Sequence, residues 1–288
     1  MQAGDGVRLR AACWPGGTKG TVFMLAGRNE HCEKYGRVAA YVTQRGYAFT
    51  TIDWRGQGLA DRLAKDPLMG HVRRFSDYQL DLAAWLEAAR AQNLPQPYYM
   101  IGHSMGGCIG LRALHNNLPF QSAVFSAPMW GVAMAPILRP VSWLLSPLMT
   151  LIGLGHWRVI GTSPDEYMLS VPFEDNKLTT DRDQWDYVLR QKRAISGIGL
   201  GSASFRWLWQ GLMETRKLRA LGPTDHDVIT FLGSQERIVD TGSIKHMMAR
   251  WENGLLVELE GAEHELPIEQ PVFRDELLDA ALELFDKT

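Results

Sequence analysis

The sequence predicts an α/β protein with a mostly parallel sheet flanked by helices, and three observations lead to this prediction. Short apolar runs alternate with longer helical patterns over residues 7–128, which is typical of βα units. The alternation stops between residues 129 and 221, where helical patterns occur without a clear buried strand. It then resumes and continues to the C-terminus. We therefore expect a sheet domain made of residues 1–128 and 222–288, with residues 129–221 inserted as a helical lid.

The first part of the chain is predicted to form a hairpin followed by alternating helices and strands. Residues 7–14 and 21–27 are strand-like and flank the turn sequence PGGTKG. A helix beginning near Lys34 is expected to end at Gly46, because glycine readily adopts the left-handed conformation that closes many helices. The next elements are expected to be a strand (47–53), a helix (75–93), a strand (98–103), a helix (105–117) and a strand (122–128).

The part of the chain after the insertion is predicted to return to the same rhythm. A strand (227–234), a helix (243–251) and a strand (255–264) follow one another, and an amphipathic helix (272–285) ends the chain. We see no internal repeat, linker or low-complexity tract.

Composition and charge exclude several classes of protein. Hydrophobic residues make up 45% of the 288 residues and charged residues 22%, which is typical of a soluble globular protein. The formal net charge of -2 provides no basic field, so we expect no nucleic-acid partner. The run EHCE (30–33) has no second cluster to complete a metal site, and we expect neither a metal nor a cofactor. The sequence does not indicate an oligomeric state.

Cysteine usage and the N-terminus both suggest a location in the cell. Cys13, Cys32 and Cys108 are an odd number without metal-ligand spacing, as expected of reduced thiols in a cytoplasmic protein. The N-terminal residues lack the apolar core of a signal peptide. The apolar stretch 134–155 contains three prolines and an arginine, which argues against a membrane-spanning helix. We expect a cytoplasmic protein that contacts the inner membrane face at most peripherally.

The sequence GHSMG (102–106) predicts a nucleophilic serine. It matches the pattern G-x-S-x-G, and it has an apolar strand before it and a helix after it, as that motif requires. The chain must turn from strand to helix at Ser104, which strains the backbone, and glycines at 102 and 106 remove side chains that would clash. We therefore expect Ser104 to be the nucleophile.

A serine needs a general base, and the base needs an orienting carboxylate. His264 follows the last predicted strand and comes last in the order serine, acid, histidine that this kind of fold uses. We expect His264 to be the base, and His103 to be a packing residue that points away from the site. Glu236 directly follows a predicted strand and is our preferred acid. Asp240 remains the alternative acid, although it is also explained as a helix N-cap.

An oxyanion hole usually takes one backbone N–H from the residue after the nucleophile and one from an earlier loop. Met105 is the residue after Ser104. The loop AGRNEHCEKY follows the second predicted strand, so Arg28 is the second candidate donor.

Five segments in combination resemble the α/β-hydrolase superfamily, and more closely its lysophospholipase L2 and monoacylglycerol lipase group of serine hydrolases. They are residues 26–62, GHVRRFSDYQLDL (70–82), GHSMGG (102–107), GSQERIVD (233–240) and GAEHEL (261–266). The resemblance covers the sheet domain and implies an α/β-hydrolase fold. It also implies a catalytic triad and two oxyanion donors at the positions already singled out: Ser104, Glu236, His264, Arg28 and Met105. One departure is Ala26, where the family often has histidine.

The insertion is expected to set the substrate. Its first half is almost uncharged and rich in Trp, Leu and Met, which indicates either an acyl-chain channel or a face that meets lipid. Its second half carries acids suited to a cationic head group or a peptide amine: Glu174, Asp175, Asp181 and Asp183. Three functions follow from these observations. They are an esterase acting on a small-molecule lipid ester such as a lysophospholipid or monoacylglycerol, a serine aminopeptidase, and a non-catalytic binding protein.

Overall fold

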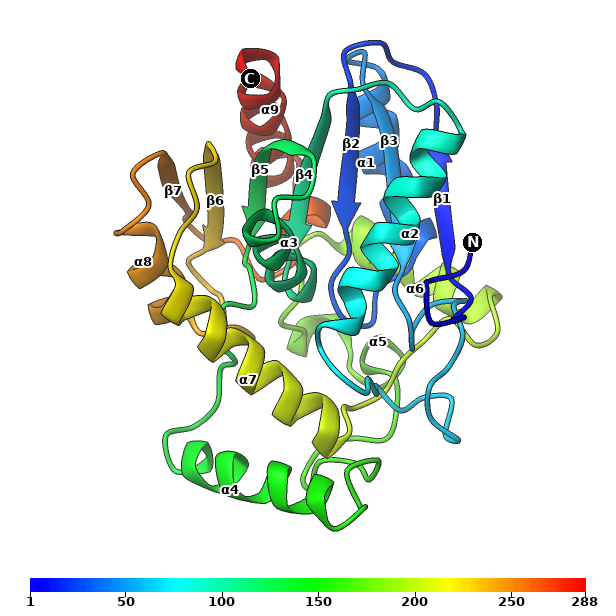
Figure 1. Ribbon diagram of the computed structural model, residues 1–288, viewed down its shortest axis with the longest axis vertical. Helices are drawn as coiled ribbons and strands as arrows, with labels where there is room; N and C mark the ends of the chain where they lie inside the picture. Colours follow the sequence, from blue (N-terminus) through cyan, green and yellow to red (C-terminus); the bar gives the residue numbers. More distant parts are fainter.

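The computed structural model describes all 288 residues and contains one seven-stranded sheet (Figure 1). The strand order is β1-β3-β2-β4-β5-β6-β7. Only β1 runs antiparallel to its neighbour; the other five pairings are parallel. The strands are β1 (Arg10–Trp14), β2 (Thr21–Leu25), β3 (Ala48–Asp53), β4 (Tyr98–His103), β5 (Phe120–Ser126), β6 (Val228–Gly233) and β7 (Gly254–Leu259).

Helices cover both faces of this sheet. In Figure 1, α2 (Asp77–Ala91) and α3 (Met105–His115) lie in front of the sheet, while α1 (Gly36–Thr43) and α9 (Pro271–Lys287) lie behind it. Helix α8 (Thr241–Met248) packs at the β7 edge. The central strands β2 and β4 are buried at every position, because a parallel strand covered on both faces contacts protein on both sides. This architecture confirms the α/β fold predicted from the sequence.

The predicted hairpin of residues 7–14 and 21–27 is wrong, because β3 lies between β1 and β2 in the sheet. The connecting residues cross the start of β3, where the N–H groups of Thr18 and Lys19 donate to the Gly46 carbonyl. Gly17 permits this crossing, since a Cβ atom there would lie 2.1 Å from the Gly46 oxygen. The sequence PGGTKG therefore makes a close crossover and not a tight turn.

The residues between β5 and β6 (127–227), here called the insertion, contain four helices and no strand of the sheet. They are α4 (Leu138–Leu151), α5 (Tyr167–Ser170), α6 (Arg182–Ala194) and α7 (Phe205–Leu221). Three short 3-10 helices complete the structure: η1 (Cys32–Tyr35), η2 (Phe173–Asp175) and η3 (Leu266–Ile268). Helix α7 crosses the molecule near the carboxyl ends of the strands, and α4 packs on α7 at the end farthest from the sheet (Figure 1).

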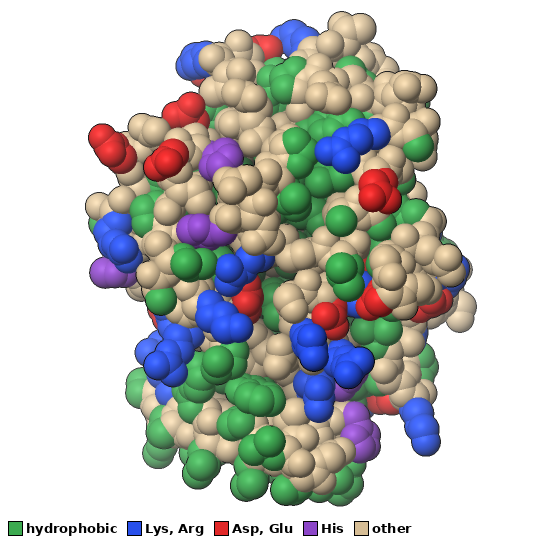
Figure 2. All heavy atoms as spheres, in the orientation of Figure 1, with side chains coloured by type: hydrophobic (Ala, Val, Ile, Leu, Met, Phe, Trp, Pro, Cys, Tyr) green, Lys and Arg blue, Asp and Glu red, His purple; other side chains and the backbone are tan.

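None of the helices combines the length and the apolar character needed to cross a lipid bilayer. The apolar side chains of α4 nevertheless face outward to an unusual degree. Leu144 is 72% exposed and Leu151 78% exposed, and further exposed apolar residues flank them: Ile137, Leu138, Val141, Leu148 and Ile152. Figure 2 shows hydrophobic side chains covering this end of the molecule.

Candidate active site

Ser104 occupies the sharp turn between β4 and α3. Its backbone has φ 50° and ψ -116°, a conformation that L-residues rarely adopt. The Ser104 N–H donates to the Ser126 carbonyl at 3.0 Å, which ties the turn to β5. A Cβ atom on Gly106 would lie 1.9 Å from the Leu25 carbonyl oxygen, so only glycine lets α3 start this close to β2. The turn therefore holds the Ser104 side chain at the carboxyl end of the sheet.

His264 and Glu236 meet at the same end of the sheet, although they come from different loops. Nδ1 of His264 lies 2.6 Å from Oε2 of Glu236, and both side chains are buried. The second carboxylate oxygen of Glu236 accepts the N–H groups of Ile238 at 2.6 Å and Val239 at 3.0 Å. Burial favours a raised pKa for Glu236, but the adjacent His264 and these two N–H groups outweigh burial and lower its pKa. Glu236 is therefore a carboxylate that can orient the imidazole.

Asp240, the alternative acid, makes different contacts. Its Oδ2 accepts the Ser243 hydroxyl at 2.9 Å and lies 3.4 Å from the Arg139 guanidinium. It stands at the N-cap position of α8, but its side chain accepts no backbone N–H of that helix. The structure therefore places Glu236, and not Asp240, in contact with His264.

One cavity brings these residues together. It has a volume of about 360 Å³, within the range typical of small-molecule sites, and both Ser104 and His264 line it. No hydrogen bond joins the Ser104 hydroxyl to the His264 imidazole in this structure. Because Nδ1 of His264 is occupied by Glu236, Nε2 is the nitrogen available to a group in the cavity.

Arg28 and Met105, the two residues predicted to be oxyanion donors, line the same cavity. The backbone N–H of each makes no hydrogen bond within the protein, in contrast to the many paired amides around them. An unpaired N–H at a cavity wall can bind an anionic oxygen. The Arg28 guanidinium donates to the Gly201 carbonyl and lies over the Trp207 ring, 5.4 Å from its centre. Burial lowers the pKa of Arg28 to about 10.

A buried charge cluster, which the sequence analysis did not find, supports the loop that carries Arg28. The Glu30 carboxylate accepts the Gly27 N–H, the Lys34 ammonium and the Tyr35 hydroxyl. Lys34 also pairs with Glu265 at 2.8 Å, so the ammonium lies between two carboxylates. Because the Glu30 carboxylate also accepts the Gly27 N–H, this cluster holds the backbone of the loop that carries Arg28. In the sequence, the only sign of this cluster is the run EHCE, which resembles part of a metal site but has no second group of ligands.

The four residues of that run do not converge on a common ligand. Glu30 belongs to the cluster just described, whereas His31 contacts Gln191, the Cys32 N–H donates to Asp53, and Glu33 pairs with Arg10. Glu30, His103 and Glu265 do come within 4.8 Å of one another through their ligand-type atoms. The Lys34 ammonium already supplies the positive charge between the two carboxylates, so these residues do not fit a metal ion.

Two side chains from the segment that follows β3 also support the loop that carries Arg28. Trp54 donates its indole N–H to the Ala26 carbonyl at 2.9 Å, and Gln57 donates to the Gly27 carbonyl at 2.8 Å. These two hydrogen bonds hold the backbone of Ala26 and Gly27. Ala26 is the position where the family that this sequence resembles often has histidine.

The expectation that His103 points away from the site is wrong. His103 lines the cavity, and its ring lies 4.8 Å from the ring of His264. Its Nδ1 lies 3.1 Å from both the carbonyl and the hydroxyl oxygen of Ser126. Burial, reinforced by the neighbouring His264, lowers the pKa of His103 to about 3. A neutral imidazole therefore packs against His264 and adds no charge.

The insertion closes the cavity, but not with the residues that its sequence suggested. From its apolar first half only Met129 and Val132 reach the wall, while the leucines of α4 face outward. The other apolar wall residues of the insertion come from later segments: Tyr167, Met168, Leu178, Val188 and Trp207. The first half of the insertion therefore does not form the expected acyl channel at this cavity, and its exposed leucines lie outside the cavity wall.

The four acids singled out in the second half of the insertion do not line the cavity. Glu174 pairs with Arg182 and Asp183 with Arg37 on the outside of the molecule, and Asp175 is exposed. Asp181 caps α6 by accepting the Gln184 N–H at 3.0 Å. They have structural or surface roles and cannot bind a head group or an amine in the cavity.

Comparisons with known proteins show the family to which the chain belongs. The family described as "Serine aminopeptidase, S33" matches residues 16–271. The chain is 28% identical to "Lysophospholipase L2" of Escherichia coli strain K12 over 292 residues, covering 92% of this chain and 80% of the relative.

Solved structures show the same fold. A soluble variant of monoglyceride lipase from Saccharomyces cerevisiae has a TM-score of 0.75 at 19% identity, covering 98% of this chain and 92% of that one. The monoacylglycerol lipase of Paleococcus ferrophilus has a TM-score of 0.76 at 16% identity, covering 97% and 99%. The chain therefore belongs to the family described as "Serine aminopeptidase, S33", and it is a serine hydrolase of the α/β-hydrolase superfamily.

Proposed function

We propose that this protein is a carboxylic-ester hydrolase that acts on monoacyl lipids such as lysophospholipids or monoacylglycerols, with Ser104 as the nucleophile. The observation that carries the proposal is the contact of 2.6 Å between His264 and Glu236 at the wall of the cavity that contains Ser104. Such a contact holds the imidazole in the tautomer that can accept a proton from the serine. The unpaired N–H groups of Arg28 and Met105 support the same assignment.

The reaction proceeds through an acyl-enzyme. Nε2 of His264 takes the hydroxyl proton of Ser104 while Oγ forms a bond to the ester carbonyl carbon, and Glu236 stabilises the imidazolium. The N–H groups of Arg28 and Met105 bind the oxyanion. The bond to the alcohol oxygen then breaks and His264 returns the proton to the alcohol. Water repeats both steps on the acyl-enzyme and releases the fatty acid.

The missing hydrogen bond between Ser104 and His264 is compatible with this mechanism. Catalytic hydrogen bonds are often long in an enzyme without substrate and tighten when substrate binds. Ser104 is held by a strained turn and His264 by Glu236, and both side chains line the same cavity.

The cavity wall supports an apolar acyl group as the substrate. Apolar side chains from α3 and from the insertion line one part of the cavity, among them Met105, Met129, Leu178, Val188 and Trp207. Each buried methylene of an acyl chain contributes about 0.8 kcal/mol to binding. The relatives named lysophospholipase and monoglyceride lipase are consistent with such a substrate.

A serine aminopeptidase is the second candidate function, and two observations favour it. The family description names this activity, and Oε2 of Glu265 lines the cavity region without a hydrogen-bond partner in the protein. Against it, the buried carboxylate that the insertion contributes nearby, Glu166, is already paired with Lys192 at 2.8 Å. A peptide α-amino group would therefore have to displace Lys192 to bind Glu166, whereas Oε2 of Glu265 is open beside the ion pair of Oε1 with Lys34.

A further part of the proposal is that the outer face of α4 contacts a lipid surface. Its exposed apolar residues, led by Leu144 and Leu151, form a continuous face on one helix, as on other helices that lie in a membrane interface. This face would bring the enzyme to the lipid from which a monoacyl substrate is taken.

A hydrolysis panel tests the proposed reaction. It contains nitrophenyl esters from short to long chains, a lysophospholipid, a monoacylglycerol and aminoacyl naphthylamides, each measured with the wild type and with Ser104→Ala. We expect serine-dependent hydrolysis of esters that rises with chain length. Serine-dependent hydrolysis of the aminoacyl amides alone would make the protein an aminopeptidase. A wild type no faster than Ser104→Ala on every substrate would support a non-catalytic binding protein.

A further inference from the structure

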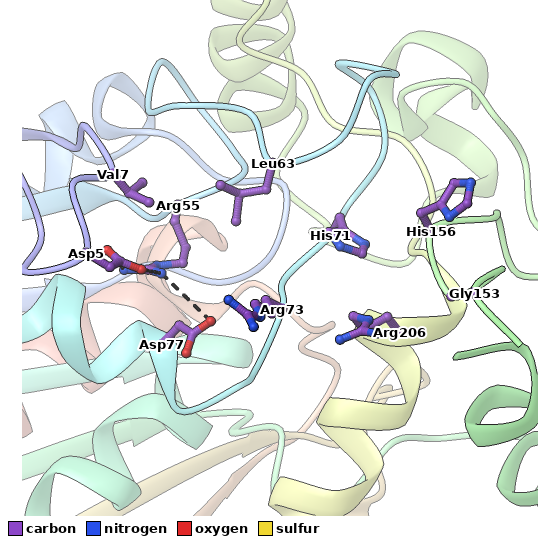
Figure 3. Close-up of a pocket in the computed structure, with 11 residues that line it drawn as sticks. Asp5, Val7, Arg55, Leu63, His71, Arg73, Asp77, Gly153, His156 and Arg206 are labelled. Carbon is purple, nitrogen blue, oxygen red and sulfur yellow. Dashed lines mark hydrogen bonds and ion pairs between the residues drawn. The ribbon is translucent and has the colours of Figure 1, made fainter. Parts of the chain in front are cut away.

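A second cavity, of about 480 Å³, lies outside the candidate active site and is lined by basic side chains from three separate segments (Figure 3). His71 and Arg73 come from the loop before α2, Arg206 from the first turn of α7, and His156 from the loop after α4. Arg55 lines the side nearest the N-terminus. None of these residues has a part in the reaction proposed above.

The acids of this cavity are gathered around one of its three arginines, Arg55. Arg55 is paired with Asp5 and with Asp81, each at 2.7 Å, and lies 3.9 Å from Asp77. Both acids that line the cavity, Asp5 and Asp77, are thus next to Arg55, as Figure 3 shows. The remaining two arginines, Arg73 and Arg206, have neither an ion pair nor a side-chain hydrogen bond in the structure.

His71 lies on the side of the cavity away from these acids (Figure 3). It makes one hydrogen bond, from Nδ1 to the Ser204 hydroxyl at 2.8 Å. Its pKa is lowered by burial and, beyond burial, by the nearby Arg206 and His156. His71, His156 and Arg206 therefore face one part of the cavity, and Asp5 and Asp77 lie on its other side next to Arg55, which favours an anion in the part away from these acids.

Exposed apolar residues next to the cavity in the sequence, here called its apolar rim, lie at and just after the end of α4. Gly153, Gly155 and His156 line the cavity, and the exposed residues Leu151, Ile152 and Trp157 flank this segment on either side. Leu151 is 78% exposed, Ile152 57% and Trp157 54%. Figure 2 shows the same juxtaposition, with Lys, Arg and His side chains gathered next to the hydrophobic end of the molecule.

We infer that this cavity binds the phosphate group of an anionic phospholipid in a membrane, with Arg73 and Arg206 as its main contacts and the end of α4 against the acyl chains. Arginine presents several N–H donors in a fork that matches phosphate oxygens, and the His71 and His156 rings can each supply a further N–H donor. This inference depends on the lipid contact proposed for α4. It does not depend on ester hydrolysis.

The surroundings favour a lipid over a free phosphate or a nucleic acid. A free phosphate would use the arginines but leave Leu151, Ile152 and Trp157 exposed to water. A nucleic acid needs a longer basic track than two unpaired arginines, and the whole chain has a net charge of -2. A phospholipid matches both the basic cavity and its apolar rim.

Vesicle co-sedimentation of the full chain tests the inference. The wild type is compared on vesicles of phosphatidylcholine alone and on vesicles containing 30% phosphatidylglycerol. We expect tighter binding to the anionic vesicles, and a loss of about 30-fold in that binding for Arg73→Gln/Arg206→Gln, because each arginine near an anionic surface adds about a fivefold factor. The matched control Arg190→Gln/Arg193→Gln removes two exposed, unpaired arginines from α6 and should bind as the wild type does.

Further measurements distinguish an error in the phosphate site from an error in the lipid contact of α4. Leu144→Gln/Leu151→Gln should weaken binding to both kinds of vesicle, and hydrolysis of a soluble short-chain ester should be unchanged in every variant. If Arg73→Gln/Arg206→Gln keeps the full preference for anionic vesicles, or loses no more than the α6 control, the phosphate site is wrong while the α4 contact stands. Titration calorimetry with inorganic phosphate gives the last arm. Millimolar or tighter binding at these arginines, without a preference for anionic vesicles, would assign the site to free phosphate and overturn the lipid assignment.

Discussion

The two carboxylate oxygens of Glu236 make different contacts at the site. Oε2 lies 2.6 Å from Nδ1 of His264, and Oε1 accepts two N–H groups of the loop that follows β6. The hydrogen bonds from Ile238 and Val239 fix the carboxylate, and the carboxylate in turn fixes the imidazole. The direction of His264 is therefore set by a backbone turn, and Nε2 is left free toward the cavity. This relationship leads directly to the first prediction.

Replacing Glu236 should cost far more activity than replacing Asp240. Glu236→Gln offers an amide where His264 needs a carboxylate, so kcat should fall by about 10⁴-fold. Asp240→Asn loses only its contacts with Ser243 and Arg139, and kcat should stay within about twofold of the wild type. Steady-state hydrolysis of one ester by both variants is the measurement. The reverse ranking would transfer the role of the acid to Asp240.

His264 should be required for the reaction in a way that other histidines are not. His264→Ala removes the general base, and kcat should fall by on the order of 10⁴-fold to 10⁶-fold, as for loss of Ser104. The double variant Ser104→Ala/His264→Ala should be no slower than either single variant, because the two residues act as a unit. His246→Ala changes an exposed histidine of α8 and serves as the control. A fall below tenfold for His264→Ala would contradict its assignment.

The sequence predicted the parts of the fold whose signals are local. Strand β4 and helix α3 were predicted at nearly their observed bounds, because an apolar run followed by GHSMG specifies a strand, a strained turn and a helix within a few residues. Glu236 and His264 were predicted because each lies near the carboxyl end of a predicted strand, where a parallel sheet gathers its functional loops, and because His264 comes last in the order serine, acid, histidine.

The parts that the sequence did not reveal depend on contacts between distant segments. Strand β1 pairs with β3 and not with its neighbour in sequence, and nothing in PGGTKG distinguishes a crossover from a turn. The ion cluster of Glu30, Lys34 and Glu265 joins residues more than 200 positions apart. The outward direction of the α4 leucines depends on which helix face α7 covers, and an all-apolar segment does not show this.

Lys34 should be essential to stability because it separates two buried carboxylates. Lys34→Met would leave Glu30 and Glu265 facing each other without a cation, and the free energy of unfolding at pH 7 should fall by about 3 to 5 kcal/mol. The double variant Lys34→Met/Glu265→Gln removes one of the two charges and should recover most of that loss. Urea unfolding of the three proteins measures both effects. Equal stability of the single and double variants would mean that the carboxylates do not repel each other.

Gly106 should tolerate no side chain. A Cβ atom there would lie 1.9 Å from the Leu25 carbonyl oxygen and 2.7 Å from that of Ala26, and both are backbone atoms that cannot move aside cheaply. We expect Gly106→Ala to reduce the free energy of unfolding by at least about 3 kcal/mol. Gly16→Ala is the matched control, since a Cβ atom there meets nothing within 4 Å, and thermal melting of both variants gives the comparison. A wild-type melting temperature for Gly106→Ala would show that the start of α3 can shift away from β2.

Two buried histidines should make the protein less stable as the pH falls below neutrality. Burial, with Lys192 nearby, lowers the pKa of His31 to about 4, and burial, with His264 nearby, lowers that of His103 to about 3. In the unfolded chain both titrate near 6.5. Between about pH 6.5 and pH 4 the unfolded chain therefore binds protons at these two histidines that the folded protein does not bind, and their contribution to the stability rises with pH across this window.

The slope of the unfolding free energy against pH measures the contribution of histidine protonation. A substitution also changes the unfolding free energy through lost contacts, but that change does not depend on pH in this window. Each histidine should contribute up to about 1.4 kcal/mol of unfolding free energy per pH unit in the window, and nothing above it. Urea unfolding at several pH values between 4.5 and 7.5 gives the slope for the wild type. His31→Asn should reduce that slope by the share of one histidine, whereas His246→Asn, at an exposed position, should leave it unchanged. If His31→Asn has the slope of the wild type, His31 takes up its proton in the folded protein, and its burial next to Lys192 does not exclude the charge.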